Sequence, residues 1–140
     1  MRYRLLSKKL VLVDFDFTLV NNHFDWINRR YINGSLEFDT DVLEIIQKES
    51  NYLPIIFTAR GIRSKKYIHK YTPWQSHFYS ILNCGNTGNK LWLIHNCINI
   101  LFTQVLWIDD LRDVDFNKAT FTEFEVDSIP ENIQLVLWRK

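Results

Sequence analysis

The chain has 140 residues, a formal net charge of +1, 46% hydrophobic residues and 15% aromatic residues. This apolar content excludes a disordered chain, and the length predicts one domain that spans residues 1–140. The near-neutral charge gives no general support for nucleic-acid binding, and no apolar run reaches the length that a membrane span needs.

Two features of the sequence predict a cytoplasmic protein. Lys8, Lys9 and Asp14 interrupt the first apolar stretch, so we expect no signal peptide. Cys84 and Cys97 lack a C-x-x-C or metal-ligand spacing, which is typical of reduced thiols. The four histidines form no zinc pattern with these cysteines.

The first predicted strand, near residues 10–14, leads into two aspartates that are spaced two residues apart. Continuous β-branched and aliphatic residues before Asp14 are typical of a parallel strand that is buried on both faces. Burying a carboxylate is costly unless a metal ion or a hydrogen-bond donor compensates. We therefore expect Asp14 and Asp16 to form a site at the end of this strand, where they could share one divalent cation. The simpler alternative is an Asp-rich turn with Thr18 as a helix cap.

A helix is predicted near residues 41–50, because its apolar residues recur at helical spacing and Thr40 or Asp41 could cap it. A second apolar strand, near residues 54–58, ends at Thr58 and is followed by Ala-Arg-Gly. Taken alone, this pattern is an ordinary exit of a strand into a turn, since Thr favours strands and Gly favours turns.

The next predicted helix, near residues 63–71, carries basic side chains interleaved with aromatic ones. Basic side chains contact phosphates and aromatic rings stack on bases, so this combination is typical of single-stranded nucleic-acid binding. The alternative is a solvated helix face with Ile68 and Tyr71 packed inward. The residues concerned are Arg60, Arg63, Lys65, Lys66, His69 and Lys70, with Tyr67, Tyr71 and Trp74.

A predicted strand near residues 78–83 is followed by a loop rich in Asn and Gly, and then by Lys90 at the expected start of a helix near residues 90–100. A lysine at a helix start opposes the helix dipole, which favours a specific anionic partner for it. A solvated surface lysine is the alternative.

Apolar strands alternate with amphipathic helices up to a strand near residues 104–109, which ends in two aspartates, and a last strand near residues 134–138. This alternation predicts right-handed βαβ units, and hence an α/β fold with a three-layer, Rossmann-like parallel sheet and helices on both faces. Ligands bind beyond the carboxyl ends of the strands of such sheets, where Asp14, Thr58 and Asp110 would meet.

Taken together, these residues resemble the four motifs of the haloacid dehalogenase-like (HAD) superfamily. The segment Asp-Phe-Asp-Phe-Thr-Leu-Val, which begins at Asp14, matches every defining position of the first motif, and Thr58, Lys90 and Asp110 follow in the family's order. The resemblance implies that Asp14 attacks phosphorus as the nucleophile and that Asp16 acts as general acid and base. It also implies that Thr58 and Lys90 hold the transferred phosphoryl group.

The same resemblance implies a Mg²⁺ ion as cofactor. Its ligands would be Asp14, the backbone carbonyl of Asp16 and Asp110, with Asp109 as a close partner. We expect Asp110 rather than Asp109 to be the direct ligand. Two spacings fit the fourth motif, Asp109 with Asp113 or Asp110 with Asp115.

Many family members carry a cap domain, but neither residues 21–52 nor residues 61–89 leave room for one. By resemblance the chain is a minimal, capless core. An open site of this kind admits phosphate groups on large molecules, or needs a partner or a second copy of the chain to exclude water. The tripeptide that ends at Arg60 is also similar to the Ser/Thr-Gly-Arg of polynucleotide 3′-phosphatase domains, with Ala in place of Gly. Arg60 and Thr18 are accordingly expected to bind substrate.

The sequence therefore predicts a Mg²⁺-dependent phosphomonoester hydrolase that works through an aspartyl phosphate, on a small molecule or a nucleic-acid end. One alternative is a nucleic-acid 3′-end phosphatase. The other is a non-catalytic HAD-like domain that binds phosphate or a partner. The presence of both acids and Lys90 argues against this last alternative, because a domain free of catalytic demand need not keep costly carboxylates together.

Overall fold

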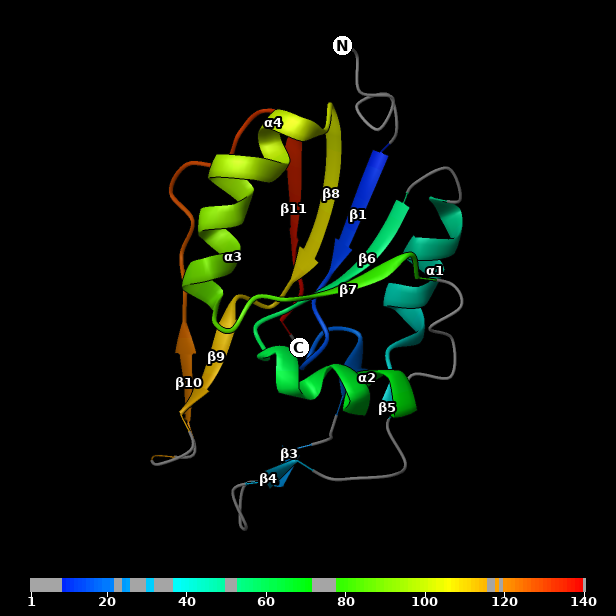
Figure 1. Cartoon of the computed structure of the whole chain (residues 1–140), viewed down its shortest axis with the longest axis vertical. Coiled ribbons are helices and arrows are strands. Elements are labelled where there is room, and N and C mark those ends of the chain that lie inside the picture. Colours follow the sequence, from blue (N-terminus) through cyan, green and yellow to red (C-terminus); the bar gives the residue numbers. More distant parts are fainter. Residues whose placement is uncertain are drawn as a thin grey trace.

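A computed structural model describes residues 9–21, 24–25, 30–31, 37–49, 53–71, 78–115, 118 and 120–139. Its centre is a five-stranded sheet in which every neighbouring pair is parallel, with the order β11-β8-β1-β6-β7 (Figure 1). This is the Rossmann-like α/β arrangement that the sequence predicts. The strands are β1 (Lys9–Val13), β6 (Leu53–Thr58), β7 (Ser80–Asn83), β8 (Gln104–Asp109) and β11 (Ile133–Leu137).

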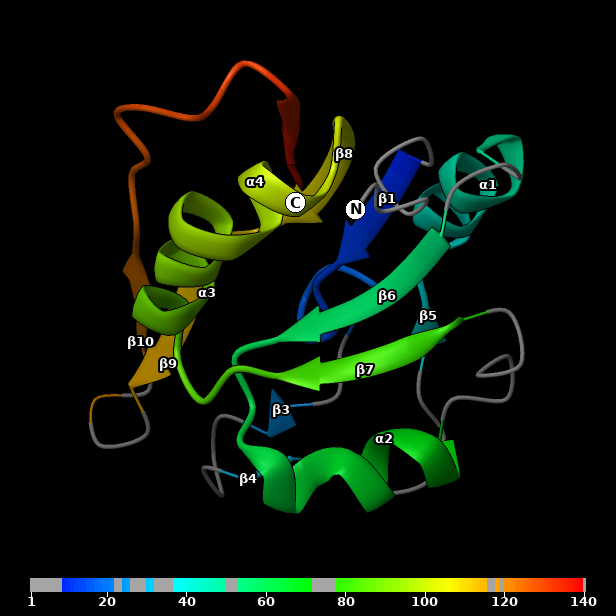
Figure 2. The ribbon, with the colours of Figure 1, turned by 45° about the horizontal axis from the view of Figure 1, so that its top comes forward.

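Hydrophobic residues cover both faces of the sheet, which explains the continuous apolar runs in its strands. Val11 and Val13 of β1 pack on one face with Val42 and Ile68, from the helices on that side. Leu10 and its neighbours pack on the other face, against the helical segment that follows β7. Figure 2 shows the sheet between these two helical layers. The helices are α1 (Thr40–Lys48), α2 (Lys65–Tyr71), α3 (Thr87–Leu93) and α4 (Asn99–Leu101).

The predicted helix near residues 41–50 is confirmed as α1, but the cap is different from the one expected. Asp39, and not Thr40 or Asp41, is the N-cap, because its Oδ1 accepts hydrogen bonds from the backbone N–H groups of Asp41 (2.9 Å) and Val42 (3.1 Å). Asp39 is buried, and its N–H donates to the carbonyl of Leu19 at 2.9 Å. The helix start is therefore anchored to the loop that follows β1.

The predicted helix near residues 90–100 begins earlier, at Thr87, so placing Lys90 at its start was wrong. Asn86 caps α3 by accepting a hydrogen bond from the backbone N–H of Asn89 at 2.8 Å. Gly85 before it has a φ of 93°, a left-handed conformation that glycine adopts without steric cost. After α3 the chain continues through a π-helical turn, Ile94–Ile98, into α4. Lys90 thus lies inside the first part of the helix, and its side chain is buried.

Three short antiparallel pairs were not predicted: β2 with β5, β3 with β4, and β9 with β10. In Figure 1, β5, β9 and β10 lie on the side of the sheet where β1 and β8 finish, and β3 and β4 lie farther out on the same side. The β9–β10 pair is therefore placed to border a site at the carboxyl ends of the strands. Their bounds are β2 (Val20–Asn21), β3 (Phe24–Asp25), β4 (Arg30–Tyr31), β5 (Glu37–Phe38), β9 (Arg112–Asp115) and β10 (Thr120–Glu123).

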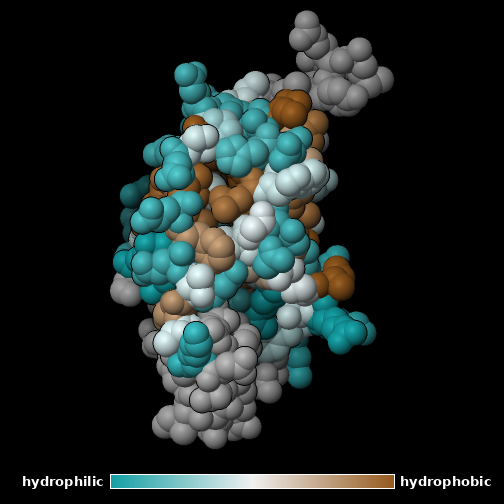
Figure 3. Space-filling model, turned by 90° about the vertical axis from the view of Figure 1, so that its left-hand side faces the viewer, coloured by the Kyte–Doolittle hydropathy of each residue, from teal (hydrophilic) through white to brown (hydrophobic). Residues whose placement is uncertain are grey.

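The described helices carry most of their large apolar side chains inward. Figure 3 shows the face on the side of α3 and the β9–β10 hairpin as a largely polar surface with separate apolar patches. Trp92, Ile100 and Leu101 are among the exposed large hydrophobic residues. In the part of the chain that is described, no helix is both long and apolar enough to cross a membrane.

Candidate metal and phosphate site

The loop after β1 turns back on itself and fixes the carboxylate of Asp14. The N–H of Asp14 donates to the carbonyl of Ile108 at 2.9 Å, which ties the end of β1 to β8. The hydroxyl of Thr18 donates to Asp14 Oδ2 at 3.1 Å, and the N–H of Leu19 donates to the Asp14 carbonyl at 3.1 Å. Asp14 is only 4% exposed. A buried carboxylate at the end of a strand is thus held in one orientation by its own loop.

Lys90 joins two of the carboxylates. Its Nζ lies 2.7 Å from Asp14 Oδ1 and 2.7 Å from Asp109 Oδ2, and its side chain is 1% exposed. Burial lowers the pKa of Lys90, but the charges of Asp109 and Asp14 raise it by more, so the net pKa is above its ordinary value. The ring of Phe57 lies beneath the ammonium group, with its centroid 5.5 Å away. Lys90 therefore stays charged and balances the buried acids.

Asp14, Asp109 and Asp110 form a buried acidic triad. One carboxylate oxygen from each lies within 4.8 Å of the others. Burial, followed by the charge of Asp14, raises the pKa of Asp109 to about 6, against the opposing effect of Lys90. Burial also raises the pKa of Asp110 to about 10, reinforced by the nearby carboxylate of Asp14. Three carboxylates this close favour either a shared proton or a cation.

The two neighbouring aspartates differ in how well they are satisfied. Asp109 accepts hydrogen bonds from Trp107 Nε1 at 3.0 Å and from the N–H of Leu111 at 2.9 Å, besides the bond from Lys90. Asp110 Oδ2 accepts one from Arg112 Nε at 3.2 Å. Within the described residues, no donor reaches Asp110 Oδ1, although this atom is buried.

An unsatisfied buried oxygen beside two further carboxylates fits a divalent cation. Hard cations such as Mg²⁺ take oxygen ligands, and the triad offers oxygens only. Asp16, which the sequence also places among the ligands, contributes no carboxylate to this triad. The expected use of its backbone carbonyl stays a prediction.

The carboxylate of Asp16 instead forms an ion pair with Arg60. Arg60 Nε lies 2.9 Å from Oδ2 and 3.2 Å from Oδ1, and Nη2 lies 3.0 Å from Oδ1. The guanidinium also lies over the rings of Tyr67 (4.7 Å to the centroid) and Phe15 (5.5 Å). Such a bidentate pair holds both side chains in a defined geometry.

Thr58 lies at the end of β6, next to this ion pair. It is fully buried, and its Oγ1 accepts a hydrogen bond from the N–H of Arg60 at 3.1 Å. Its carbonyl accepts a hydrogen bond from the N–H of Cys84 at 2.8 Å. Asn83 Nδ2 donates to the carbonyl of Gly61 at 3.2 Å, so the turn after β6 is tied to the end of β7.

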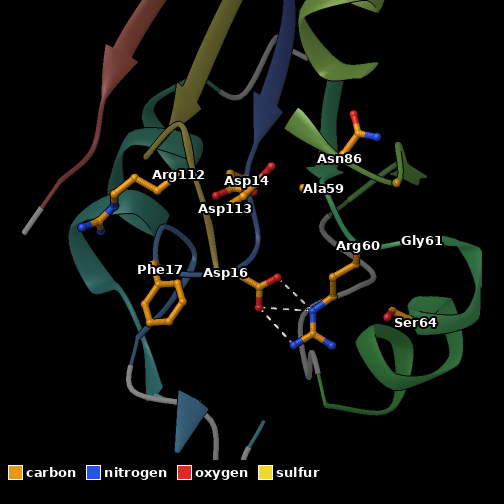
Figure 4. A pocket seen from close by; sticks show the side chains of 11 residues that line it. Asp14, Asp16, Phe17, Ala59, Arg60, Gly61, Ser64, Asn86, Arg112 and Asp113 are labelled. Atoms are coloured by element: carbon orange, nitrogen blue, oxygen red, sulfur yellow. Dashed lines mark hydrogen bonds and ion pairs between the residues drawn. The ribbon is translucent and has the colours of Figure 1, made fainter. Parts of the chain in front are cut away.

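A cavity of about 390 Å³ opens at this edge of the sheet. Figure 4 shows Asp16 between Phe17 on one side and Arg60 on the other. A volume of this size holds a small organic ligand and not only an ion. Its lining residues are Asp14, Asp16, Phe17, Ala59, Arg60, Gly61, Ser64, Gly85, Asn86, Arg112 and Asp113.

Asp113, one of the two candidates for the second acid of the last motif, anchors the helix that carries Lys90. The hydroxyl of Thr87, the first residue of α3, donates to Asp113 Oδ1. For the other candidate, Asp115, the side chain lies outside the described residues, as do Trp74 and the side chain of Tyr71. Ile68 is buried as expected.

Several residues that shape the site had no clear signal in the sequence. Arg112 is the first residue of β9, and its side chain contacts that of Asp110, two residues before it in the chain. Arg139 Nε donates to the carbonyl of Asp110 at 2.8 Å, and the N–H of Trp138 donates to the carbonyl of Asp109 at 2.8 Å. The last described residues of the chain therefore brace the backbone of the acidic pair. The sequence Trp-Arg at residues 138–139 matches no motif that would predict these contacts.

No protein-family model, curated protein or solved structure matches the chain. The fold and the site define a Rossmann-like α/β protein with a buried acidic triad that could hold a metal ion.

Proposed function

We propose that the chain is a Mg²⁺-dependent phosphomonoester hydrolase of the HAD type, with a minimal, capless core. The contact of Lys90 Nζ with both Asp14 and Asp109, at 2.7 Å each, carries this proposal. Lys90 is 76 residues from Asp14 along the chain, yet it reaches the residue that the first motif marks as the nucleophile. Burying a lysine and two acids carries a desolvation cost, which favours a functional role for Lys90.

Asp14 performs the first displacement in this proposal. One of its carboxylate oxygens bonds to phosphorus while the bond from phosphorus to the ester oxygen breaks. Once protonated, Asp16 releases Arg60 and gives its proton to the departing oxygen, so the alcohol leaves as a neutral molecule. The product on the protein is an acyl phosphate on Asp14, which divides one difficult hydrolysis into two easier steps.

Water completes the cycle. Asp16 takes a proton from the attacking water, whose oxygen bonds to phosphorus as the bond to Asp14 Oδ breaks. Inorganic phosphate leaves, and both carboxyl groups return to their starting forms. The position of Asp16 at the cavity supports this role, since it lines the cavity together with Asp14.

Four further side chains act on charge and orientation. Lys90 balances the negative charge of Asp14 as an anionic phosphate approaches. Thr18 holds Asp14 Oδ2, and Thr58 fixes the backbone N–H of Arg60 beside the cavity. Arg60 is the guanidinium best placed to meet substrate oxygens, since it lines the cavity while it orients Asp16.

Asp14, Asp110 and the Asp16 carbonyl would hold Mg²⁺, with Asp109 beside them. When bound, the ion would offset the repulsion between the phosphate and the acids. The contrast within the acidic pair supports Asp110 as the direct ligand, because Asp109 already accepts three hydrogen bonds whereas Asp110 Oδ1 accepts none from the described residues.

A nucleic-acid 3′-end phosphatase is the second candidate. Gly61 and Ser64, which line the cavity, begin the segment that leads into α2. The basic residues of this segment are exposed, so they could meet a phosphate backbone that enters from that side. These residues are Arg63, Lys65, Lys66, His69 and Lys70.

A phosphatase screen tests the proposal. Sugar phosphates, nucleotides and 3′-phosphorylated oligonucleotides are offered with Mg²⁺ and with a chelator. The proposal expects Mg²⁺-dependent release of phosphate that is lost in Asp14→Asn. Release that continues unchanged in the chelator or in Asp14→Asn would refute it.

A further inference from the structure

One residue of the site adopts a conformation that its side chain does not favour. Phe17, between Asp16 and Thr18, has a φ of 61°. Bulky residues with a Cβ atom rarely adopt this left-handed conformation, which glycine adopts freely. Strained backbone conformations cluster at functional sites, so the conformation of Phe17 indicates a role for its side chain.

The ring of Phe17 forms part of the cavity wall. It packs edge-on against Phe121 of β10, with 4.9 Å between ring centroids and an interplanar angle of 88°. The guanidinium of Arg112 lies 4.2 Å from the centroid of the Phe121 ring. Arg112 in turn contacts Asp110 of the acidic triad. Phe17 therefore forms an aromatic wall of the cavity. Phe121 of the β9–β10 hairpin packs behind it, and Arg112 links Phe121 to the proposed metal site.

The charges around the cavity argue against recognition of a second phosphate group. Arg60 pairs with Asp16, and Arg112 pairs with Asp110. Both guanidinium groups are therefore already engaged by acidic side chains of the site itself. The cavity of about 390 Å³ is nevertheless larger than a phosphoryl group needs, so it has room for the organic part of an ester.

We propose that this aromatic wall selects phosphate monoesters that carry a planar aromatic ring, of which nucleoside monophosphates are the simplest biological class. The ring of the substrate stacks against Phe17 while its phosphate lies at Asp14. This inference rests on the proposed hydrolase function for the position of the phosphate. It adds the substrate class and the residue that determines it.

Adenosine 5′-monophosphate and ribose 5-phosphate provide a matched pair of probes, because both release the same kind of primary alcohol and differ in the base. The wild-type protein should show a kcat/KM at least about 5-fold higher for the nucleotide, since stacking of one base on an aromatic side chain gives a factor of about 5 to 150. Phe17→Leu keeps an apolar side chain but removes the ring, and should bring the ratio of the two values close to one.

Two further variants complete the design. Phe121→Leu removes the support behind Phe17 and should lower the same ratio, which keeps the test valid should Phe17→Leu fold poorly. Trp92→Leu is the matched control, because Trp92 is 59% exposed on α3 and does not line the cavity. It should leave the ratio as in the wild type. A ratio near one in the wild type, or one that both Phe variants leave unchanged, would overturn the proposal.

Direct binding separates this inference from the hydrolase itself. Calorimetric titration of the wild-type protein and of Phe17→Leu with each probe measures affinity without relying on turnover. Tighter binding of the nucleotide that depends on Phe17, with no hydrolysis of either probe, would contradict the proposed function and support the aromatic preference. Equal binding of both probes would overturn the preference, whatever the hydrolysis shows.

Discussion

Asp110→Asn should have opposite effects on stability in the absence and in the presence of metal. Asp110 is 1% exposed, and its pKa is raised to about 10 from an ordinary value of 3.8, first by burial and then by Asp14. A raised pKa means that the folded chain keeps a proton that the unfolded chain releases. This contribution to stability is fully present below pH 3.8 and is lost as the pH rises towards 10.

The size of this effect follows from the pKa. A pH of 7 lies about three units above the ordinary pKa of a carboxyl group. By this pH the folded chain has therefore lost up to about 4 kcal/mol of the stability that Asp110 contributes at low pH. An amide needs no proton, so Asp110→Asn should unfold at higher temperature than the wild type in a chelator at pH 7. Its stability should also depend less on pH between 5 and 9. For a chain of this length each kcal/mol corresponds to about 3 °C.

Mg²⁺ should reverse the stability advantage of Asp110→Asn over the wild type. A ligand that binds only the folded state adds about 2.7 kcal/mol at a concentration of 100 times its Kd. The wild type should gain this stability from Mg²⁺, and should gain more at pH 8 than at pH 6 because the ion competes with the proton on Asp110. Asp110→Asn should gain little.

Thermal or urea denaturation with a chelator and with millimolar Mg²⁺ measures both effects. Asp127→Asn serves as control, since Asp127 is exposed and outside the triad. If Asp110→Asn were less stable than the wild type in the chelator and kept the full Mg²⁺ effect, the account of the triad as a metal site would be wrong.

Two other variants test neighbouring parts of the account. Lys90→Met leaves the buried carboxylates of Asp14 and Asp109 without their cation. It should lower the free energy of unfolding, measured by urea denaturation at pH 7, by about 3–5 kcal/mol. A decrease below about 1 kcal/mol would mean that the ion pair does not hold the site together. Lys65→Ala with Lys66→Ala should flatten the salt dependence of oligonucleotide binding if the basic segment contacts a phosphate backbone, and an unchanged slope would leave it as a solvated helix face.

The centre of the sheet could be predicted from the sequence because β1, β6 and β8 are largely buried on both faces. Each of these strands contains a long apolar run, and the runs of β1 and β8 end at Asp14 and Asp109, the first polar side chains of the site. The parallel order of strands brings their carboxyl ends together, so residues far apart in the chain could be expected at one edge. The contact of Lys90 with Asp14 is the clearest example.

The partners of individual side chains could not be predicted in the same way. Nothing in the spacing of Asp16 and Arg60 distinguishes an ion pair between them from separate contacts with substrate. The β9–β10 hairpin was missed because each of its strands is short and carries a single apolar residue, Val114 or Phe121, which is too weak a signal for a strand. The start of α3 was missed because Gly88, a weak helix former, lies in its first turn, whereas the Asn86 cap decides the boundary.

The site of phosphorylation on the protein is the most direct test of the central claim. The protein is mixed with a substrate that it hydrolyses in the presence of Mg²⁺, quenched in acid, and mapped by mass spectrometry of its peptides. The account predicts a phosphoryl group on Asp14, none in Asp14→Asn, and turnover by that variant that is lower by several orders of magnitude, with Asp127→Asn behaving as the wild type. A phosphoryl group on another residue, or hydrolysis by Asp14→Asn at the wild-type rate, would contradict it.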